Sequence, residues 1–266
     1  MSSAPITLIT DFGTTDYFAG AMKGAILSVN PQAQIIDITH DVAPHDIYEG
    51  AFTLLAAYKT FPFKTVHVAV VDPGVGSKRR PILVVAGDYF FVGPDNGLFG
   101  YVYEREPDAR VFHLTNEKYF RAVVSHTFHG RDLFAPVAGA VSIGVEPSEL
   151  GPEIKDYVRL EPLALRAVEG QGIEATVIHV DRFGNCITNI TREDLTEEMI
   201  MKGARLRIGS RHITDFRKFF AADGADKREP FAIWGSAGFL EIAAFQASAA
   251  RLLGIERGER LLLLVD

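Results

Sequence analysis

The chain has 266 residues, of which 47% are hydrophobic and 23% charged, and its formal net charge is -7. This composition is typical of a water-soluble globular protein with a real core. The absence of a Lys/Arg-rich run argues against a nucleic-acid partner, and no apolar run approaches the roughly 20 residues that cross a bilayer. A single cysteine, Cys186, excludes an internal disulfide and a cysteine-based metal site. With no signal-peptide pattern, we expect a cytoplasmic protein with no membrane association.

The first half of the sequence alternates two kinds of segment. Short Val- and Ile-rich runs predict six strands, at Ile6–Thr10, Ile35–Ile38, Val66–Val71, Ile82–Ala86, Tyr89–Val92 and Val111–Leu114. Apolar residues at helical spacing predict three helices, at Tyr17–Val29, Ile47–Phe61 and Leu133–Ile143. Because the strands are apolar throughout and alternate with helices, both faces of the sheet should be covered. Residues 1–150 therefore predict an α/β layered domain with a mostly parallel sheet.

The second half has a different pattern. Residues 151–168 are rich in charge and proline and predict a linker. Beyond it, short strand-like runs occur at Glu174–Val180, Ile187–Ile190, Ala204–Ile208, Phe231–Trp234, Phe239–Ile242 and Arg260–Val265, with one helical segment, Gln246–Leu253. Short strands separated by turns are typical of small barrels and sandwiches. We expect residues 169–266 to form a small C-terminal β-barrel domain.

Two acidic segments follow predicted strands of the first half. Asp11, in Thr10–Gly13, comes at the end of the first strand, where open α/β sheets bind ligands. Its carboxylate could accept hydrogen bonds from a ribose diol, or it could cap a helix or turn. Asp72 begins a glycine-containing loop, 72–80, whose spacing fits neither a P-loop nor a dinucleotide fingerprint. That loop combines a carboxylate with Arg79 and Arg80, and a structural ion pair is the alternative to a functional site.

Two further segments mix Gly, Asp, Asn and His. His129 lies beside Gly130, where a ligand could approach closely, although a single histidine is more often structural. In the second half, Asp181–Asn185 has the Asp-x-x-Gly signature of a turn. Its polar side chains could instead contact a ligand, and the ring of Phe183 could stack on a base.

Six motifs in this order resemble one family, the S-adenosylmethionine hydroxide adenosyltransferases, which are related to fluorinase and chlorinase. The motifs are TDFGTTDYF, VVDPGVGSKRRP, GPDNGLF, TFHGRD, DRFGNCITNI and GSAGFLEIA, and they extend almost from end to end of the chain. The resemblance implies an α/β N-terminal domain joined to a small β barrel. It also implies a homotrimer with active sites at subunit interfaces.

The resemblance also implies residue roles. Asp72, Arg79 and His129 match the trio that handles the nucleophilic water in hydrolytic members, with the choice of Arg79 over Arg80 resting on spacing. For substrate binding, the matches imply Asp11 on the ribose, Asp181 and Ser236 on the methionine end, Asn185 on adenine, and Phe183 and Phe220 around the nucleoside. Fluorinase has tyrosines at the positions of Asp72 and His129, which argues against a halide nucleophile here. It also has a serine at the position of Gly130, but chlorinase has glycine there, so Gly130 does not exclude chloride. Fluorinase also has an arginine where this chain has Ala237, so the resemblance does not carry that contact with the methionine carboxylate over to this chain.

The expected reaction is hydrolysis of S-adenosyl-L-methionine at C5′ to adenosine and methionine, with the cofactor molecule acting as substrate and no other cofactor or metal required. Either Asp72 or His129 could take the proton from water. Two alternatives stay open: a halogenase that uses the same substrate, and a non-catalytic S-adenosylmethionine sensor. A structural or interaction protein is less consistent with polar residues gathered at strand ends.

Overall fold

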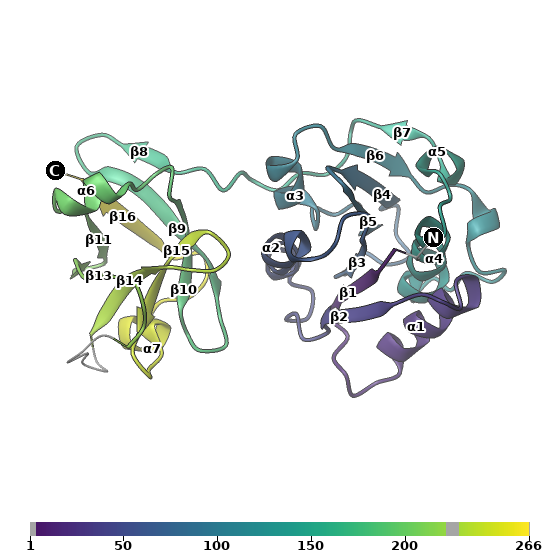
Figure 1. The fold of residues 1–266 in the computed structure, drawn as a ribbon, viewed down its shortest axis with the longest axis horizontal. Helices are drawn as coiled ribbons and strands as arrows, with labels where there is room; N and C mark the ends of the chain where they lie inside the picture. Colours follow the sequence, from purple (N-terminus) through teal and green to yellow (C-terminus); the bar gives the residue numbers. More distant parts are fainter. Residues whose placement is uncertain (1–3, 222–228, 266) are drawn as a thin grey trace. The chain divides into compact units, whose positions relative to one another are not determined.

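The structure is a computed structural model that describes residues 4–221 and 229–265. The chain divides into two compact units, Met1–Pro162 and Leu163–Asp266, which Figure 1 shows in purple to teal and in green to yellow. Each unit is described by itself below. Among the described residues, no helix combines the length and apolar character needed to cross a membrane.

A seven-stranded sheet forms the centre of the first unit, in the order β2-β1-β3-β5-β4-β6-β7. Its strands are β1 (Ile6–Thr10), β2 (Ile35–Thr39), β3 (Val66–Val70), β4 (Pro81–Ala86), β5 (Tyr89–Pro94), β6 (Arg110–His113) and β7 (Glu153–Ile154). The strands β1 and β3 are buried along their whole length, as expected for strands covered on both faces. All six predicted strands of this half are present.

The prediction of a mostly parallel sheet is wrong, because the sheet is evenly mixed. The pairs β1–β2, β1–β3 and β3–β5 are parallel, whereas β4–β5, β4–β6 and β6–β7 are antiparallel. The reason is a tight hairpin in which Ala86 pairs with Tyr89 across Gly87 and Asp88. Gly87 takes a positive φ of 55° there, which is the conformation that a two-residue hairpin turn demands and that glycine adopts without strain.

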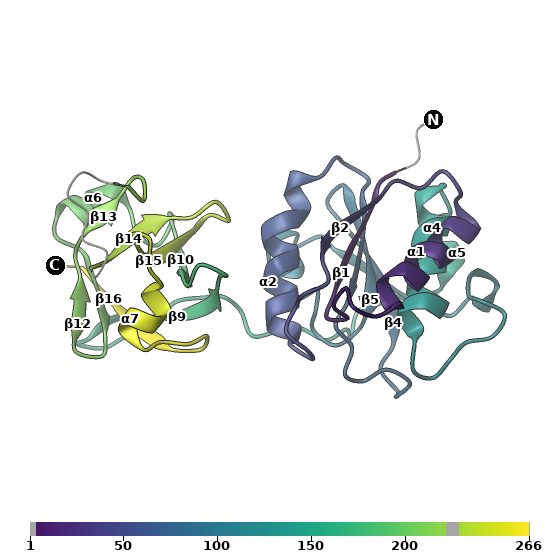
Figure 2. The ribbon, with the colours of Figure 1, turned by 90° about the horizontal axis from the view of Figure 1, so that it is seen from below.

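Helices cover both faces of this sheet (Figure 2). On one face lie α1 (Phe18–Val29) and α4 (Ala135–Ser142), which pack against each other; on the other lie α2 (Ile47–Ala57) and α3 (Gly100–Arg105). The remaining helical segments are α5 (Pro147–Leu150), the 3-10 turns η1 (Tyr58–Thr60) and η2 (Glu117–Tyr119), and the π-helical η3 (Gly130–Phe134). Two separate buried clusters fill the layers, one on each side of the sheet.

The second unit is built from strands that are almost all antiparallel. They follow the order β12-β11-β16-β9-β10-β15-β14-β13, with β8 also paired to β9. The strands are β8 (Arg166–Val168), β9 (Gly172–Val180), β10 (Cys186–Thr191), β11 (Arg205–Ile208), β12 (Arg211–Ile213), β13 (Phe216–Arg217), β14 (Pro230–Trp234), β15 (Phe239–Ala244) and β16 (Arg260–Leu264), and the helices are α6 (Glu197–Met201) and α7 (Ala249–Leu253).

The expected β-barrel is not established by this arrangement. Alternate side chains from β9, β10, β11, β14, β15 and β16 do share one apolar core. However, the path of paired strands starts at β12 and ends at β13, and in the described part of the chain these two edges are not paired with each other. The unit is therefore an open sheet curved over a core. The prediction of a separate C-terminal β domain is confirmed, but its closure into a barrel is not.

Residues 151–168, which the sequence predicts as a linker, are not all linker. The strand β7 extends the first sheet by pairing with β6, and β8 pairs with β9 in the second unit. Charged and proline-rich segments can add such short edge strands because an edge needs partners on one side only.

Candidate active site

The first part of the site forms at one edge of the mixed sheet. Thr10, the last residue of β1, pairs with Val70, the last residue of β3. Asp11 and Asp72 come one and two residues after these strand ends. Because parallel strands end at the same edge of a sheet, the fold brings the two carboxylates to one edge, which is where open α/β sheets bind ligands.

Asp72, Arg79 and His129 form one connected polar network. Arg79 donates from Nε to both carboxylate oxygens of Asp72 at 3.0 Å and from Nη2 to Oδ2 at 2.5 Å. The same Nη2 lies 2.6 Å from Nδ1 of His129. Both members of the ion pair are almost completely buried, with 8% of the Arg79 side chain and 5% of the Asp72 side chain exposed. The structure thus brings together the three residues that the sequence singled out.

This contact fixes the protonation of the histidine. A guanidinium can only donate, so Nδ1 of His129 must be the acceptor, and the proton of the neutral ring resides on Nε2. Burial, followed by the positive charge of Arg79, lowers the pKa of His129, which is consistent with a neutral ring. His129 therefore presents an N–H donor at Nε2.

Arg80 has a different role from its neighbour. It pairs with Asp95 at 2.7 Å and with Asp156 at 2.8 Å, and its Nη2 also donates to the backbone oxygen of Asp156. These contacts tie the loop after β3 to residues 95 and 156 of the same unit. Arg79, and not Arg80, is therefore the arginine that contacts both Asp72 and His129.

A small pocket of about 140 Å³ lies beside the network. Asp72 and His129 contribute to its wall, together with Thr127 and Gly130. The rest of the lining is apolar and comes from Phe12, Phe18, Phe128, Val70 and Val75. The three phenylalanine rings contact one another edge-on or at a tilt, with centroids 5.1–5.9 Å apart. Charged groups thus meet an apolar aromatic wall, and weak screening beside apolar side chains strengthens electrostatic interactions.

Two loops meet at this pocket. A Cβ built on Gly76 would lie 2.3 Å from the backbone oxygen of His126, and Gly76 has a φ of 76°. Only glycine allows this close approach of the 72–80 loop to the segment before His129. That segment enters η3, and π-helical turns of this kind occur often at functional sites.

Asp11 is held close by. Its Oδ2 accepts a hydrogen bond of 2.9 Å from the backbone N–H of His45, a residue with a positive φ of 68°. Only 9% of the Asp11 side chain is exposed. Phe12, the next residue, lines the pocket, so Asp11 borders the site without forming its wall.

The second unit carries the other predicted residues, and Asp181 is committed to a turn. Its Oδ1 accepts from the backbone N–H groups of Phe183 and Asn185 at 2.9 and 2.8 Å, and its Oδ2 accepts from Nδ2 of Asn185 at 2.8 Å. Gly184 follows with a φ of 83° and packs against Ser248 so closely that a Cβ would clash. The turn interpretation of this motif is therefore correct, and the turn orients the Asn185 side chain.

This turn borders a large open pocket of about 930 Å³. Four of the predicted residues line it, namely Asp181, Phe183, Asn185 and Phe220. Phe183 is 77% exposed and Phe220 is 44% exposed. Exposed aromatic rings beside a pocket are ready partners for a flat ligand ring, since stacking removes both surfaces from water.

Ser236 lies apart from the lining of that pocket, at an exposed turn between β14 and β15. The preceding residue, Gly235, leaves room for the Glu241 carboxylate, which a Cβ at that position would overlap. Burial, and then the charge of Asp181, raises the pKa of Glu241 to about 7. The second unit thus holds a carboxyl group that the sequence did not single out, and its negative charge is lost below neutral pH.

The sequence also did not single out the aromatic wall of the small pocket. Phe12, Phe18 and Phe128 belong to the TDFGTTDYF and TFHGRD motifs, so the signal was present. Most phenylalanines are core residues, however, and only the tertiary contacts separate these three from the rest. Within the described ranges, no group of three or more His, Cys, Asp or Glu side chains is arranged to hold a metal ion.

Two family models match most of the chain. The SAM hydroxide adenosyltransferase N-terminal domain matches residues 6–151, and the corresponding C-terminal domain matches residues 175–262. A solved structure of an uncharacterised conserved protein from Thermotoga maritima superimposes with a TM-score of 0.88 and 34% sequence identity, covering 96% of this chain and 98% of that one.

Named relatives point in the same direction. A protein from Methanocaldococcus jannaschii called (R)-S-adenosyl-L-methionine hydrolase is 40% identical over 94% of this chain and 92% of its own length. One of the same name from Thermus thermophilus is 35% identical over 96% of this chain and 97% of its own length. A fluorinase from an Actinoplanes species is 26% identical over 95% of both chains. The chain belongs to the SAM hydroxide adenosyltransferase family.

Proposed function

We propose that this protein hydrolyses S-adenosyl-L-methionine at C5′ to give adenosine and L-methionine. The observation that carries the proposal is the buried Asp72–Arg79–His129 network beside a small aromatic pocket, in a chain whose relatives are named as hydrolases of this molecule. In the reaction, the oxygen of water bonds to C5′ and the C5′–S bond breaks, with its electron pair moving to sulfur. The sulfonium leaves as the neutral thioether of methionine, so no acid is needed on that side.

The three network residues would act on the water in different ways. Arg79 cannot give up its proton, and Nδ1 of His129 is occupied by the guanidinium. Both Asp72 oxygens also accept from Arg79, but a carboxylate has about four lone-pair sites. Asp72 is therefore the member of the trio that can still accept the proton of the attacking water, while Nε2–H of His129 is a donor that can orient its oxygen. Positioning contributes roughly 7–11 kcal/mol in favourable cases, and general-base assistance about 10²–10⁴-fold.

The aromatic wall suits the other reactant. A sulfonium is a positive charge with little hydration, and aromatic faces attract such cations. The rings of Phe12, Phe18 and Phe128 provide these faces within the small pocket. As hydroxide approaches the sulfonium, charge is neutralised, and a pocket with little water favours that step.

The remaining predicted residues would hold the rest of the substrate. We propose that Asp11 binds the ribose hydroxyls, that Asn185 contacts adenine and that Phe183 and Phe220 flank the nucleoside. Asp181 and Ser236 would contact the methionine end, with Asp181 acting as a turn residue as well. We further propose a cytoplasmic homotrimer with active sites at subunit interfaces, as the family resemblance implies, and the presence of predicted site residues in both units is compatible with such sites. No metal or additional cofactor enters this chemistry.

The names of the relatives also specify a stereochemical form. The α-carbon of L-methionine has the S configuration, so the descriptor (R) refers to the stereogenic sulfonium. We propose that this protein also prefers the (R) sulfonium epimer. The test is to supply each epimer separately and compare the rates of hydrolysis.

The decisive experiment uses the purified full-length protein, each sulfonium epimer of the substrate and ¹⁸O-labelled water, with and without chloride. Adenosine labelled at its 5′ oxygen, together with methionine, is the expected result. A 5′-halogenated nucleoside would identify a halogenase. Tight binding with intact substrate would identify a sensor, and either result would overturn the proposal. Sedimentation at several protein concentrations tests the trimer.

A further inference from the structure

We propose that Asp132 is a positioning residue for this reaction: its buried carboxylate organises the 121–129 segment that places His129 against Arg79. This inference rests on the proposed function. Asp132 does not line the small pocket and does not belong to the trio, and it would act through the residues that do.

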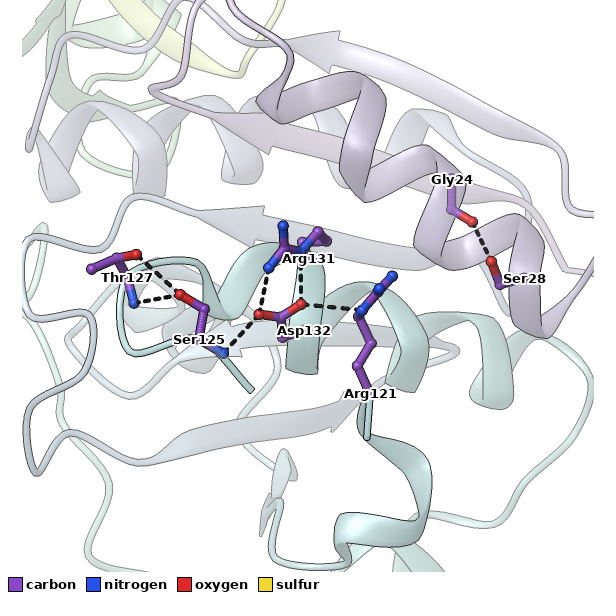
Figure 3. Close-up of polar contacts among 7 residues, drawn as sticks. All are labelled: Gly24, Ser28, Arg121, Ser125, Thr127, Arg131 and Asp132. Carbon is purple, nitrogen blue, oxygen red and sulfur yellow. Dashed lines mark hydrogen bonds and ion pairs between the residues drawn. The ribbon is translucent and has the colours of Figure 1, made fainter. Parts of the chain in front are cut away.

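Asp132 is a completely buried carboxylate, with none of its side chain exposed. Figure 3 shows three groups converging on it. Arg131 donates from Nε and Nη2 at 2.7 and 2.9 Å, the backbone N–H of Ser125 donates at 2.9 Å, and Nε of Arg121 lies 3.3 Å away. Burial alone would favour the neutral acid, but the hydrogen bonds from Arg131 and Ser125 hold the pKa of Asp132 below its usual value. The group is therefore a buried anion.

Two of these contacts lead to the pocket wall, and the third holds the segment itself. Ser125, fixed through its backbone to Asp132, contacts Thr127 through its hydroxyl, as Figure 3 also shows, and Thr127 lines the pocket. The guanidinium of Arg131 lies over the ring of Phe128, 5.0 Å from its centroid. The backbone N–H of Arg121 donates to the backbone oxygen of Asp132, which closes the segment on itself.

The geometry of η3 makes this arrangement relevant to His129. His129 comes directly before η3, and Asp132 lies three residues further on within it. The backbone N–H of Asp132 donates to the oxygen of Phe128. The contacts from Arg131, Ser125 and Arg121 that hold the Asp132 carboxylate therefore also hold the turn from which the imidazole of His129 projects. Since a displacement of about 1 Å can cost about 10²-fold in rate, a loosened segment would slow turnover while the rest of the substrate still binds.

The test is Asp132→Asn, which keeps the shape of the side chain and removes its charge. We expect kcat to fall about 10- to 100-fold with little change in the KM for S-adenosylmethionine. The ¹⁵N resonances of the His129 ring should also change from a single Nε2–H tautomer in the wild type to a mixture in the variant, because the contact with Arg79 is loosened.

A matched control separates positioning from fold stability. Glu106 is a largely buried carboxylate of the same unit, paired with Lys59 at 2.9 Å and with the hydroxyl of Tyr58 at 2.9 Å. Glu106→Gln should lower the melting temperature and leave kcat and the His129 resonances unchanged. If Asp132→Asn behaves like this control, the inference is wrong and Asp132 supports only the fold.

Two further variants keep the inference testable if Asp132→Asn does not fold. Arg131→Gln removes the two shorter contacts and the cation above Phe128, and Arg121→Gln removes the longer contact. Arg131→Gln should lower kcat more than Arg121→Gln does, and equal rates at the wild-type level would overturn the inference. A wild-type protein that forms no adenosine would instead refute the proposed function itself.

Discussion

The loops that begin at Asp72 and Asp181 look alike in sequence and differ in structure. In each, an aspartate follows a strand and a glycine comes within three residues. Asp181 is satisfied locally, by donors that are two and four residues away. Asp72 is satisfied by Arg79, which in turn reaches His129, 50 residues further along the chain. A local turn needs only its own sequence, whereas a network of residues from distant segments needs a fold that joins them.

The pockets beside the two loops also differ, in size and in lining. The one beside Asp72 is small, aromatic and close to buried charges, while the one beside Asp181 is large and open and bears exposed rings. We therefore expect variants of the first region to affect the chemical step and variants of the second to affect substrate binding. The predictions below test this division, from the largest expected effect to the smallest.

The largest effect should come from the buried network. Arg79→Gln removes the cation that joins Asp72 to His129 and leaves a buried carboxylate without its partner. We expect kcat to fall about 10²- to 10⁴-fold, measured as adenosine release at saturating substrate. Arg80→Gln is the matched control, because its contacts are with Asp95 and Asp156. Equal losses of kcat in the two variants would contradict the assignment of Arg79.

The exposed ring of Phe183 tests the second region. Stacking of a base on an aromatic side chain contributes about 1–3 kcal/mol by alanine substitution, so Phe183→Ala should raise KM roughly 5- to 150-fold with kcat preserved. The side chain is 77% exposed, so the melting temperature should not change. Steady-state kinetics and a thermal scan measure both quantities. A fall in kcat at unchanged KM would contradict the assignment of the second region to substrate binding.

Glu241 predicts a pH dependence of binding. Its pKa is raised to about 7 by burial and by Asp181, so the carboxyl is ionised above that pH and neutral below it. A cationic substrate should bind more weakly as the pH falls through 7, with KM rising several-fold, up to about tenfold per pH unit for one linked proton. The KM of Glu241→Gln should be high and flat across the same range. A wild-type KM that is flat between pH 6 and 8 would exclude this linkage.

The smallest effect should come from Gly130. A Cβ there would lie 3.2 Å from Sδ of Met22 and 3.3 Å from the Phe128 ring, so the neighbours must shift slightly. Gly130→Ala should destabilise the fold by about 1 kcal/mol and lower kcat a few-fold, because the pocket wall moves. Gly20, on the exposed face of α1, has no atom within 4 Å of a built Cβ. Gly20→Ala should instead raise the melting temperature and leave kcat unchanged.

The sequence predicted local structure well where one signal dominated. Six of the seven strands of the first unit and its longest helix, Phe18–Val29 in the structure, follow from apolar periodicity, whereas β7 lies in the predicted linker. The mixed character of the sheet was missed because strand direction depends on the connection, and the turn at Gly87 was not interpreted as a hairpin. Closure of the second sheet was overestimated, since edge pairing involves residues far apart in the chain.

The sequence by itself determined the residue types of the site and, through six ordered motifs, the family to which the chain belongs. It placed a carboxylate after β1 and another after β3, because each apolar run is followed by a segment that contains Asp and Gly. Only the tertiary structure decided which of two adjacent arginines joins the network, which nitrogen of His129 bears the proton, and that Asp132 supports the segment from within. These outcomes depend on contacts between residues up to 76 positions apart, and such contacts exist only when the folded backbone brings their donors and acceptors within hydrogen-bonding distance.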